Sequence, residues 1–381
     1  MMAASLLAAL LAGDVVSWTT GLRTESRTRT AAPGAQQGPL PLELAVDPAA
    51  GLSAVSDTLR GAIEYQPHLG VQQADGKQRA TVLHRLAATS ELRVDRRTRV
   101  AFEERLSLGE NNFTPLASAA TGPPDPRVPQ QAFVARYLQQ SALLTLETVV
   151  ARGARAGTSL GYQADGGLGA QSRKLIPVLQ GPRAAAFFSS ALSRLTTANA
   201  GLDVAYASST AGSRAVIASA SGTLEHAFDR RVRGSLTLGA AGAGGSASAA
   251  QAFPVAALSL EGSVPLRGQA LSGALHVSAR PTADRYTGGA YERLEVSATG
   301  DFRALEALSF GARASGGAVV SGPARGQSIG QGELSGTLSA RRGLAFTAGC
   351  RLAWTQPVAG QPGGAALSAF ALAQVATAGV F

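Results

Sequence analysis

Short, mostly basic turns recur along this chain at a nearly constant interval, and this spacing constrains the fold more than any other feature. Successive turns lie about 40 residues apart, with one longer interval that contains a proline-rich stretch. Each interval holds two strand-like runs separated by a longer loop rich in Gly, Ala, Ser or Pro. Short turns that alternate with long loops predict an antiparallel barrel of hairpins. The turns fall near Asp57, Arg96, Gly153, Arg194, Arg230, Arg267, Ala304 and Arg342.

Within these intervals apolar and polar residues alternate, which is the period of a strand with one apolar face. Leu59 and Ile63, for example, share one face while Arg60 and Glu64 share the other. The apolar face is rich in Ala, Gly and Leu, which favours contact with lipid. Backbone groups in hydrocarbon must all be paired, so such a sheet must close. We therefore predict an all-β, up-and-down transmembrane barrel of about 18 strands, with 16 as the alternative.

The chain divides into a short leader and one large domain. Residues 1–13, MMAASLLAALLAG, resemble the apolar core of a secretory signal. No Lys or Arg precedes this run, so we predict a shortened signal peptide at 1–13. Residues 14–381 are predicted to form a single transmembrane barrel domain.

The end of the chain carries a resemblance. An alternating last strand that finishes on Phe381 resembles the C-terminal signal of Gram-negative outer-membrane proteins, and the whole architecture is similar to porin-like barrels. The resemblance implies a location in the bacterial outer membrane, surrounded by its lipid, and insertion by barrel-assembly machinery that engages Phe381. It implies no substrate, and it leaves open whether the barrel forms an oligomer.

Composition excludes several other classes of function. The net charge is +9, yet no basic cluster is interleaved with aromatic residues, so we expect no nucleic-acid partner. The four histidines lie far apart without metal-ligand spacing, and we expect neither a metal nor a cofactor. Ser159 lies in a G-x-S-x-G match at 157–161, but inside a predicted strand that no helix follows. We therefore expect no enzyme, and the single Cys350 excludes an internal disulfide.

One carboxylate breaks the alternation. Glu104 and His84 fall on apolar faces, where a charged group facing lipid is costly. We expect a bulge or a register shift around residues 102–105. A lipid-hydrolysing site in the barrel wall is the minor alternative.

The polar faces should line the lumen with charges of both signs. The predicted pore-lining residues are Arg60, Glu64, Arg85, Glu91, Arg93, Arg99, Glu103, Arg105, Arg233, Arg293, Glu295, Arg313 and Arg351. Two long loops, 114–131 and 166–182, are candidates for a constriction, with Arg127, Arg173 and Lys174 as their charged residues.

These features favour a porin-like passive channel for small, mildly anionic solutes, because barrels of this size commonly enclose water. Two alternatives remain open at this point. One is a structural or assembly barrel of the outer membrane, and the other is an export pore for an acidic polysaccharide.

Overall fold

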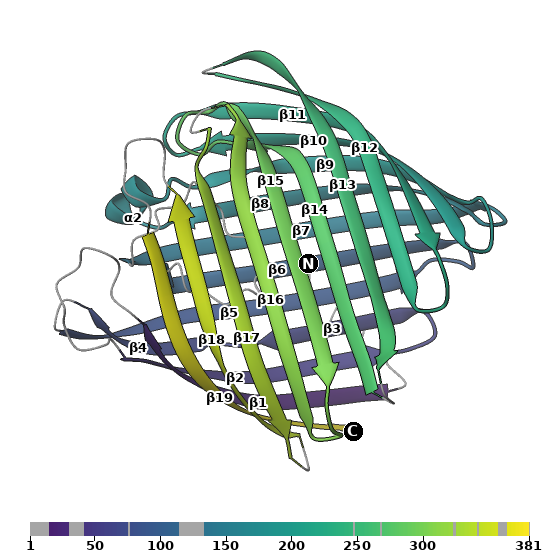
Figure 1. Cartoon of the computed structure of the whole chain (residues 1–381). Helices are drawn as coiled ribbons and strands as arrows, with labels where there is room; N and C mark the ends of the chain where they lie inside the picture. The colour runs from purple at the N-terminus through teal and green to yellow at the C-terminus, as the bar shows by residue number, and fades with distance from the viewer. Residues whose placement is uncertain are drawn as a thin grey trace.

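The chain forms one antiparallel sheet that closes on itself (Figure 1). The computed structural model describes residues 15–29, 42–74, 77–113, 133–246, 248–266, 269–322, 325–340, 343–356 and 364–380. The predicted leader at 1–13 lies outside these residues. The first elements are β1 (Val15–Arg29), β2 (Leu42–Val55), β3 (Leu59–Tyr65), β4 (His68–Ala74), β5 (Lys77–Arg93), β6 (Thr98–Phe113), β7 (Phe133–Ala151), β8 (Ala154–Gly167), the short helix α2 (Ala170–Leu175), β9 (Leu179–Ala191) and β10 (Thr196–Ser209).

The same up-and-down order continues to the end of the sheet. The remaining strands are β11 (Arg214–Ala227), β12 (Val232–Gly245), β13 (Ser248–Leu266), β14 (Gln269–Ala283), β15 (Ala290–Arg303), β16 (Leu308–Ser321), β17 (Ser328–Ser339), β18 (Leu344–Gln356) and β19 (Gly364–Val380). Both β3 and β4 pair with β2 on one side and β5 on the other, so they are two pieces of one crossing strand. The predicted 18-stranded barrel is confirmed.

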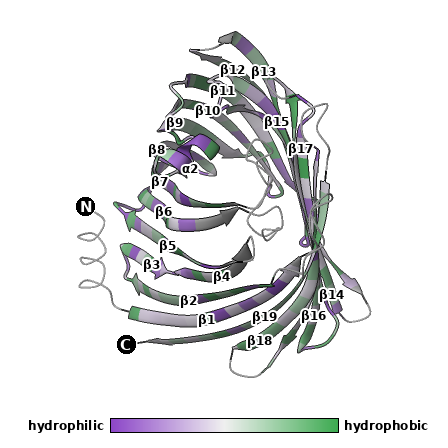
Figure 2. Cartoon of the chain, turned by 90° about the vertical axis from the view of Figure 1, so that its left-hand side faces the viewer, coloured by the Kyte–Doolittle hydropathy of each residue, from purple (hydrophilic) through white to green (hydrophobic). Residues whose placement is uncertain are grey.

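The alternation of faces follows the register of the ladders. Leu236, Leu352 and Trp354 point outward, and each remains almost half exposed because no other part of the chain covers it. Their sequence neighbours point inward, and Figure 2 shows hydrophilic and hydrophobic residues alternating along the strands. This pattern fits a sheet with lipid outside and water inside. The barrel is an outer-membrane protein, as its sequence predicts. Among the described residues, no helix is both long and apolar enough to cross a membrane.

Closure depends on the seam where the first and last strands meet. β1 pairs with β19 from Ser17 opposite Val380 to Arg29 opposite Ser368. On the inner face Arg351 of β18 reaches across β19 to the carboxylate of Glu25 on β1, at 2.6 Å. It also contacts Glu333 on β17 at 2.7 Å. We call Arg351, Glu25 and Glu333 the seam cluster.

An aromatic ring supports this reach. The Arg351 guanidinium lies 4.0 Å from the ring centroid of Phe370, an inward-facing residue of β19. Arg351 is only 3% exposed, so its charge depends on these partners. Breaking a buried ion pair leaves an uncompensated charge and is strongly destabilising. The seam cluster therefore ties four neighbouring strands together where the chain's two ends meet.

We expect Arg351→Met to lower the free energy of unfolding by about 3 kcal/mol, because Glu25 and Glu333 lose their cationic partner in a buried position. Reversible urea unfolding in lipid vesicles measures this change. The control is Arg183→Met, which removes a lumen arginine paired with Asp203 at 2.5 Å but half exposed. The control should cost less than about 1 kcal/mol. Equal losses for the two variants would contradict a special role of the seam.

Candidate functional site

The inner wall of the barrel is the candidate site, and the ladders place every predicted pore-lining residue on it. Arg60 lies opposite Glu91, Arg93 opposite Arg99, and Glu333 opposite both Arg313 and Arg351. The other predicted residues alternate in step with these and therefore lie on the same face of the sheet: Glu64, Arg85, Glu103, Arg105, Arg233, Arg293 and Glu295. Their role in transport stays a prediction.

Some of these charges are paired along the wall. On β6–β8 Glu147 accepts from Arg99 at 2.9 Å and from Arg155 at 3.4 Å. On β14–β15 Glu295 lies 3.0 Å from Arg293 and 3.6 Å from Arg280. Such pairs along neighbouring strands stabilise the sheet and leave little free charge at these places.

A second paired group lies beside the seam. Arg27 of β1 forms a bidentate contact with Glu43 of β2, at 2.8 Å and 2.5 Å. Asp47 of β2 accepts from His68 of β4 at 2.5 Å. The register of β1, β2 and β4 brings these residues together on the inner face.

The long-loop end of the barrel is narrowed by chain that folds over it. The connection between β8 and β9 carries α2, which lies just inside the ring of strands in the view down this end (Figure 2). Ile176 and Val178, which follow α2, are 1% and 5% exposed and fix the connection in place. The predicted constriction residues Arg173 and Lys174 lie on α2 and are exposed. Arg127 and the loop 114–131 lie outside the described residues.

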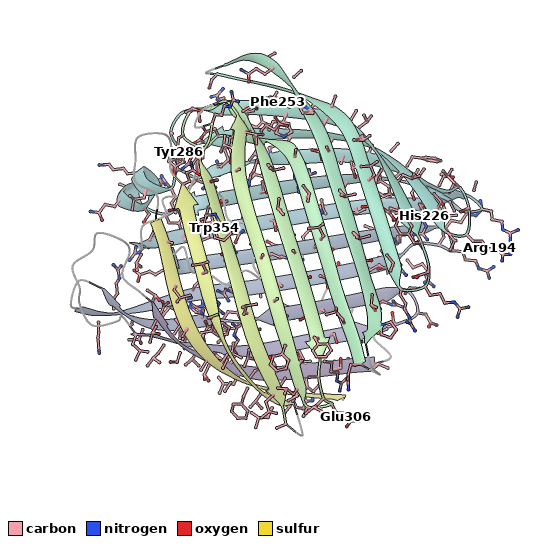
Figure 3. All side chains as sticks on the ribbon, viewed as in Figure 1. Arg194, His226, Phe253, Tyr286, Glu306 and Trp354 are labelled. Carbon is pink, nitrogen blue, oxygen red and sulfur yellow. The ribbon has the colours of Figure 1, made fainter. Side chains whose placement is uncertain are left out.

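A second connection meets the first across this mouth. Arg285, in the turn between β14 and β15, donates to Asp165 at the end of β8, at 2.6 Å. Tyr286 donates to the Leu175 carbonyl on α2 at 2.9 Å, and Figure 3 shows Tyr286 beside that helix. Strands β10 to β13 lie between these elements in the sheet order, so the contacts span part of the opening. We call residues 284–289 together with the α2 connection the mouth bridge.

The mouth bridge is ordered by its own hydrogen bonds. Asp284, which is 1% exposed, accepts from the backbone of Tyr286 and the hydroxyl of Thr287. Ser209, in the β10–β11 hairpin, donates to the Arg285 carbonyl at 2.5 Å. Gly288 has φ 72° and lies so close to Ser213 that an added Cβ would come within 2.2 Å of it. These contacts fix the turn against two other hairpins.

The barrel wall divides where this turn folds inward. β13 and β14 pair only from Ala256 opposite Ala279 toward the short-turn end, although both strands continue beyond this point. Above it, Ala290 of β15 packs against Ala243 and Phe253 of β12 and β13. The outer face of one hairpin thus covers the inner face of another. Phe253 is 6% exposed because it is buried inside this overlap.

At the opposite end the short turns present arginines. Asp95 accepts the backbone N–H groups of Arg97 and Thr98, and these hydrogen bonds lower the pKa of Asp95. Asp229 makes the same pair of contacts to Arg231 and Val232. Both turns read Asp-Arg-Arg, and the carboxylate holds each turn while its arginines stay exposed. Figure 3 shows Arg194 and Glu306 at this end. Arg267 and Arg342 lie outside the described residues.

The alternative sites gain no support from the geometry. Ser159 lies in the middle of β8, opposite Thr145 and Ala185, and not at a turn from a strand into a helix. No group of metal-ligating side chains occurs in the part of the chain that the structure describes. The bulge expected at Glu104 is wrong, because both ladders of β6 run through it in register. Glu104 faces outward and accepts from Gln140 at 3.2 Å, whereas His84 bonds Tyr65.

We expect Arg285→Ala to shift the closed-to-open equilibrium of the mouth by about tenfold or more, because a charge-assisted hydrogen bond contributes about 1.5–3 kcal/mol. Single-channel recording in planar bilayers measures the open fraction. Arg214→Ala, which removes an exposed arginine from the same end, is the control. Adding Asp165→Asn to Arg285→Ala should change little further. Identical recordings from Arg285→Ala and the control would show that this ion pair does not hold the mouth.

The chain is similar in fold to several solved structures, and it matches one family model. The structure of OpdO of Pseudomonas aeruginosa is 16% identical in sequence and has a TM-score of 0.49, and the match covers 95% of this chain and 97% of OpdO. OccAB4 of Acinetobacter baumannii is 9% identical over 97% and 99% of the two chains, also with a TM-score of 0.49. OpdK of Pseudomonas aeruginosa is 12% identical over 95% and 99%, with a TM-score of 0.45. At these scores we infer nothing about cargo from them.

No curated protein matches the sequence. A family model, in contrast, matches residues 10–380 and therefore spans every described strand. This porin-like outer-membrane barrel belongs to the EpsX exopolysaccharide export family.

Proposed function

We propose that this barrel is the outer-membrane pore through which an exopolysaccharide leaves the cell. The observation that carries the proposal is the family match over residues 10–380, because it covers the barrel itself and not a separate attached domain. A polymer export family whose model covers the whole barrel points to the lumen as the route.

The inner wall supports this role chemically. It carries Arg, Glu, Gln, Ser and Thr side chains that can exchange hydrogen bonds with sugar hydroxyls. In a hydrated lumen such contacts replace contacts with water, so a glycan can move from one to the next without a large desolvation cost. The mouth bridge would have to open for a polymer to pass.

Passive passage of small, mildly anionic solutes is the second candidate. The exposed arginines of the Asp95 and Asp229 turns favour it, since a basic entrance attracts anions. Passive passage uses the same lumen, but solutes small enough to pass the mouth bridge would not require it to open.

Three partner assignments belong with these proposals. The outward apolar side chains would contact outer-membrane lipid, and insertion would depend on assembly machinery that engages Phe381. Phe381 lies outside the described residues, so its role stays a prediction. Assembly into an oligomer also stays open.

We expect deletion of the gene to remove exopolysaccharide from the cell surface and to raise the amount retained in the periplasm. Both fractions are measured by sugar analysis of washed cells and periplasmic extracts, and the intact gene on a plasmid should restore the surface fraction. If surface polysaccharide is unchanged while uptake of small anions falls, the second candidate replaces the first.

A further inference from the structure

Several lumen arginines form no ion pair among the described residues, and three of them lie close together on neighbouring strands. Arg85, Arg93 and Arg105, on β5 and β6, form no ion pair within the described residues, whereas Arg27, Arg99 and Arg351 each contact a carboxylate. Arg85 has only a longer-range electrostatic attraction to Asp47, so all three side chains are available to a ligand. We call them the free arginine set.

Their neighbours across the ladders offer no compensation. Arg105 lies between Ala87 on β5 and Ser141 on β7, and Arg85 lies opposite Ser107. Arg93 lies directly opposite a second arginine, Arg99. Like charges in this position destabilise a sheet. Arg99 is balanced by Glu147, so the uncompensated member of the pair is Arg93. The fold by itself gains nothing from this arrangement, but an anion in the lumen would.

The free arginine set is open to the lumen and lies among neutral polar groups, with the carboxylates of Glu91 and Glu103 on the same face of β5 and β6. Arg93 and Arg105 are exposed and Arg85 is half-buried. Gln139 lies opposite Ser107, and Gln163 lies opposite Ser141, so an amide and a hydroxyl accompany each of the two deeper arginines. Guanidinium groups bind carboxylates, while amides and hydroxyls exchange hydrogen bonds with sugar hydroxyls. The combination matches a glycan that carries carboxylates.

The inner wall of β10–β12 has a different character. Several of its inward positions at mid-height are small, and the charged Asp203 among them is already paired with Arg183; the small residues include Gly201, Ser219, Ser221, Gly239 and Ala241. These small residues hold a passing chain weakly because they present neither charge nor long side chains. An anionic polymer would therefore contact the β5–β8 wall more strongly than this part of the lumen.

We propose that the exported polysaccharide is acidic and that Arg85, Arg93 and Arg105 form its track, with Gln139, Gln163 and Ser141 contacting its hydroxyls. This inference rests on the proposed export function and names the chemical class of the cargo. The arginines of the Asp95 turn lie next to Arg93 and would bring the chain to the start of this track.

The test is block of ion current through the purified full-length barrel in planar bilayers, with sugar oligomers added at the short-turn end. The probes are an oligogalacturonate, which is anionic, and a dextran of similar length, which is neutral. We expect half-block by the oligogalacturonate at a concentration at least about tenfold lower than by the dextran, with the difference shrinking as salt is raised.

The variant that tests the track is Arg85→Gln with Arg105→Gln. We expect it to raise the half-blocking concentration of oligogalacturonate by about tenfold, because two charges that are open to the lumen each contribute modestly. The control is Arg214→Gln with Arg325→Gln, which removes the same charge from exposed positions at the long-loop end. The control should keep the affinity of the unaltered barrel, and heat-dependent migration on a gel confirms folding of both.

The outcomes separate this inference from the function on which it rests. Equal block by the two sugars, or equal affinity of the track variant and the control, overturns the acidic track while leaving glycan passage in place. Block by neither sugar overturns the track and also counts against export through this lumen.

Discussion

Everything in this structure depends on the pairing of backbone groups in a medium without water. A transmembrane sheet with a free edge would leave a row of N–H and C=O groups facing hydrocarbon, so the first and last strands must meet. That meeting brings together segments more than three hundred residues apart in sequence, here Glu25 on β1 and Arg351 on β18. The ion pairs of the seam cluster lie at the place where the barrel closes. They are shielded from water there, with the Arg351 guanidinium against the ring of Phe370.

Charges on the inner wall therefore divide into two kinds. Paired charges such as Arg27 with Glu43 fix neighbouring strands relative to one another, and their attraction is used within the protein. Unpaired charges such as Arg105 add nothing to the fold and remain available to whatever enters the lumen. A count of charges cannot separate these kinds, because both are arginines on alternating strands. Paired and unpaired charges can be told apart only from the strand register, which sets which residues lie opposite each other.

The general fold could be predicted because it rests on local patterns: an alternation of period two and a turn about every 40 residues. The seam cluster and the mouth bridge could not, since both depend on contacts between distant segments. Glu104 shows a different limit. Its outward position was correctly indicated by alternation, but the physical cost of a carboxylate near lipid favoured a bulge that the ladders do not contain. Instead of a bulge, a hydrogen bond from Gln140 on the adjacent strand provides the Glu104 carboxylate with a polar partner.

The division of the wall between β13 and β14 has a mechanical consequence. Above Ala256 and Ala279 the end of β14 has no ladder bonds to β13, whereas β15 stays paired with β16 up to Glu292 opposite Ser321. The end of the hairpin is therefore anchored along one edge, and side-chain and turn contacts hold its other edge inside the mouth. Pro281, which has no N–H to donate to a ladder, lies on the strand with the free edge. A displacement of this edge would change the width of the exit without breaking the pairing of β13 and β14 below it.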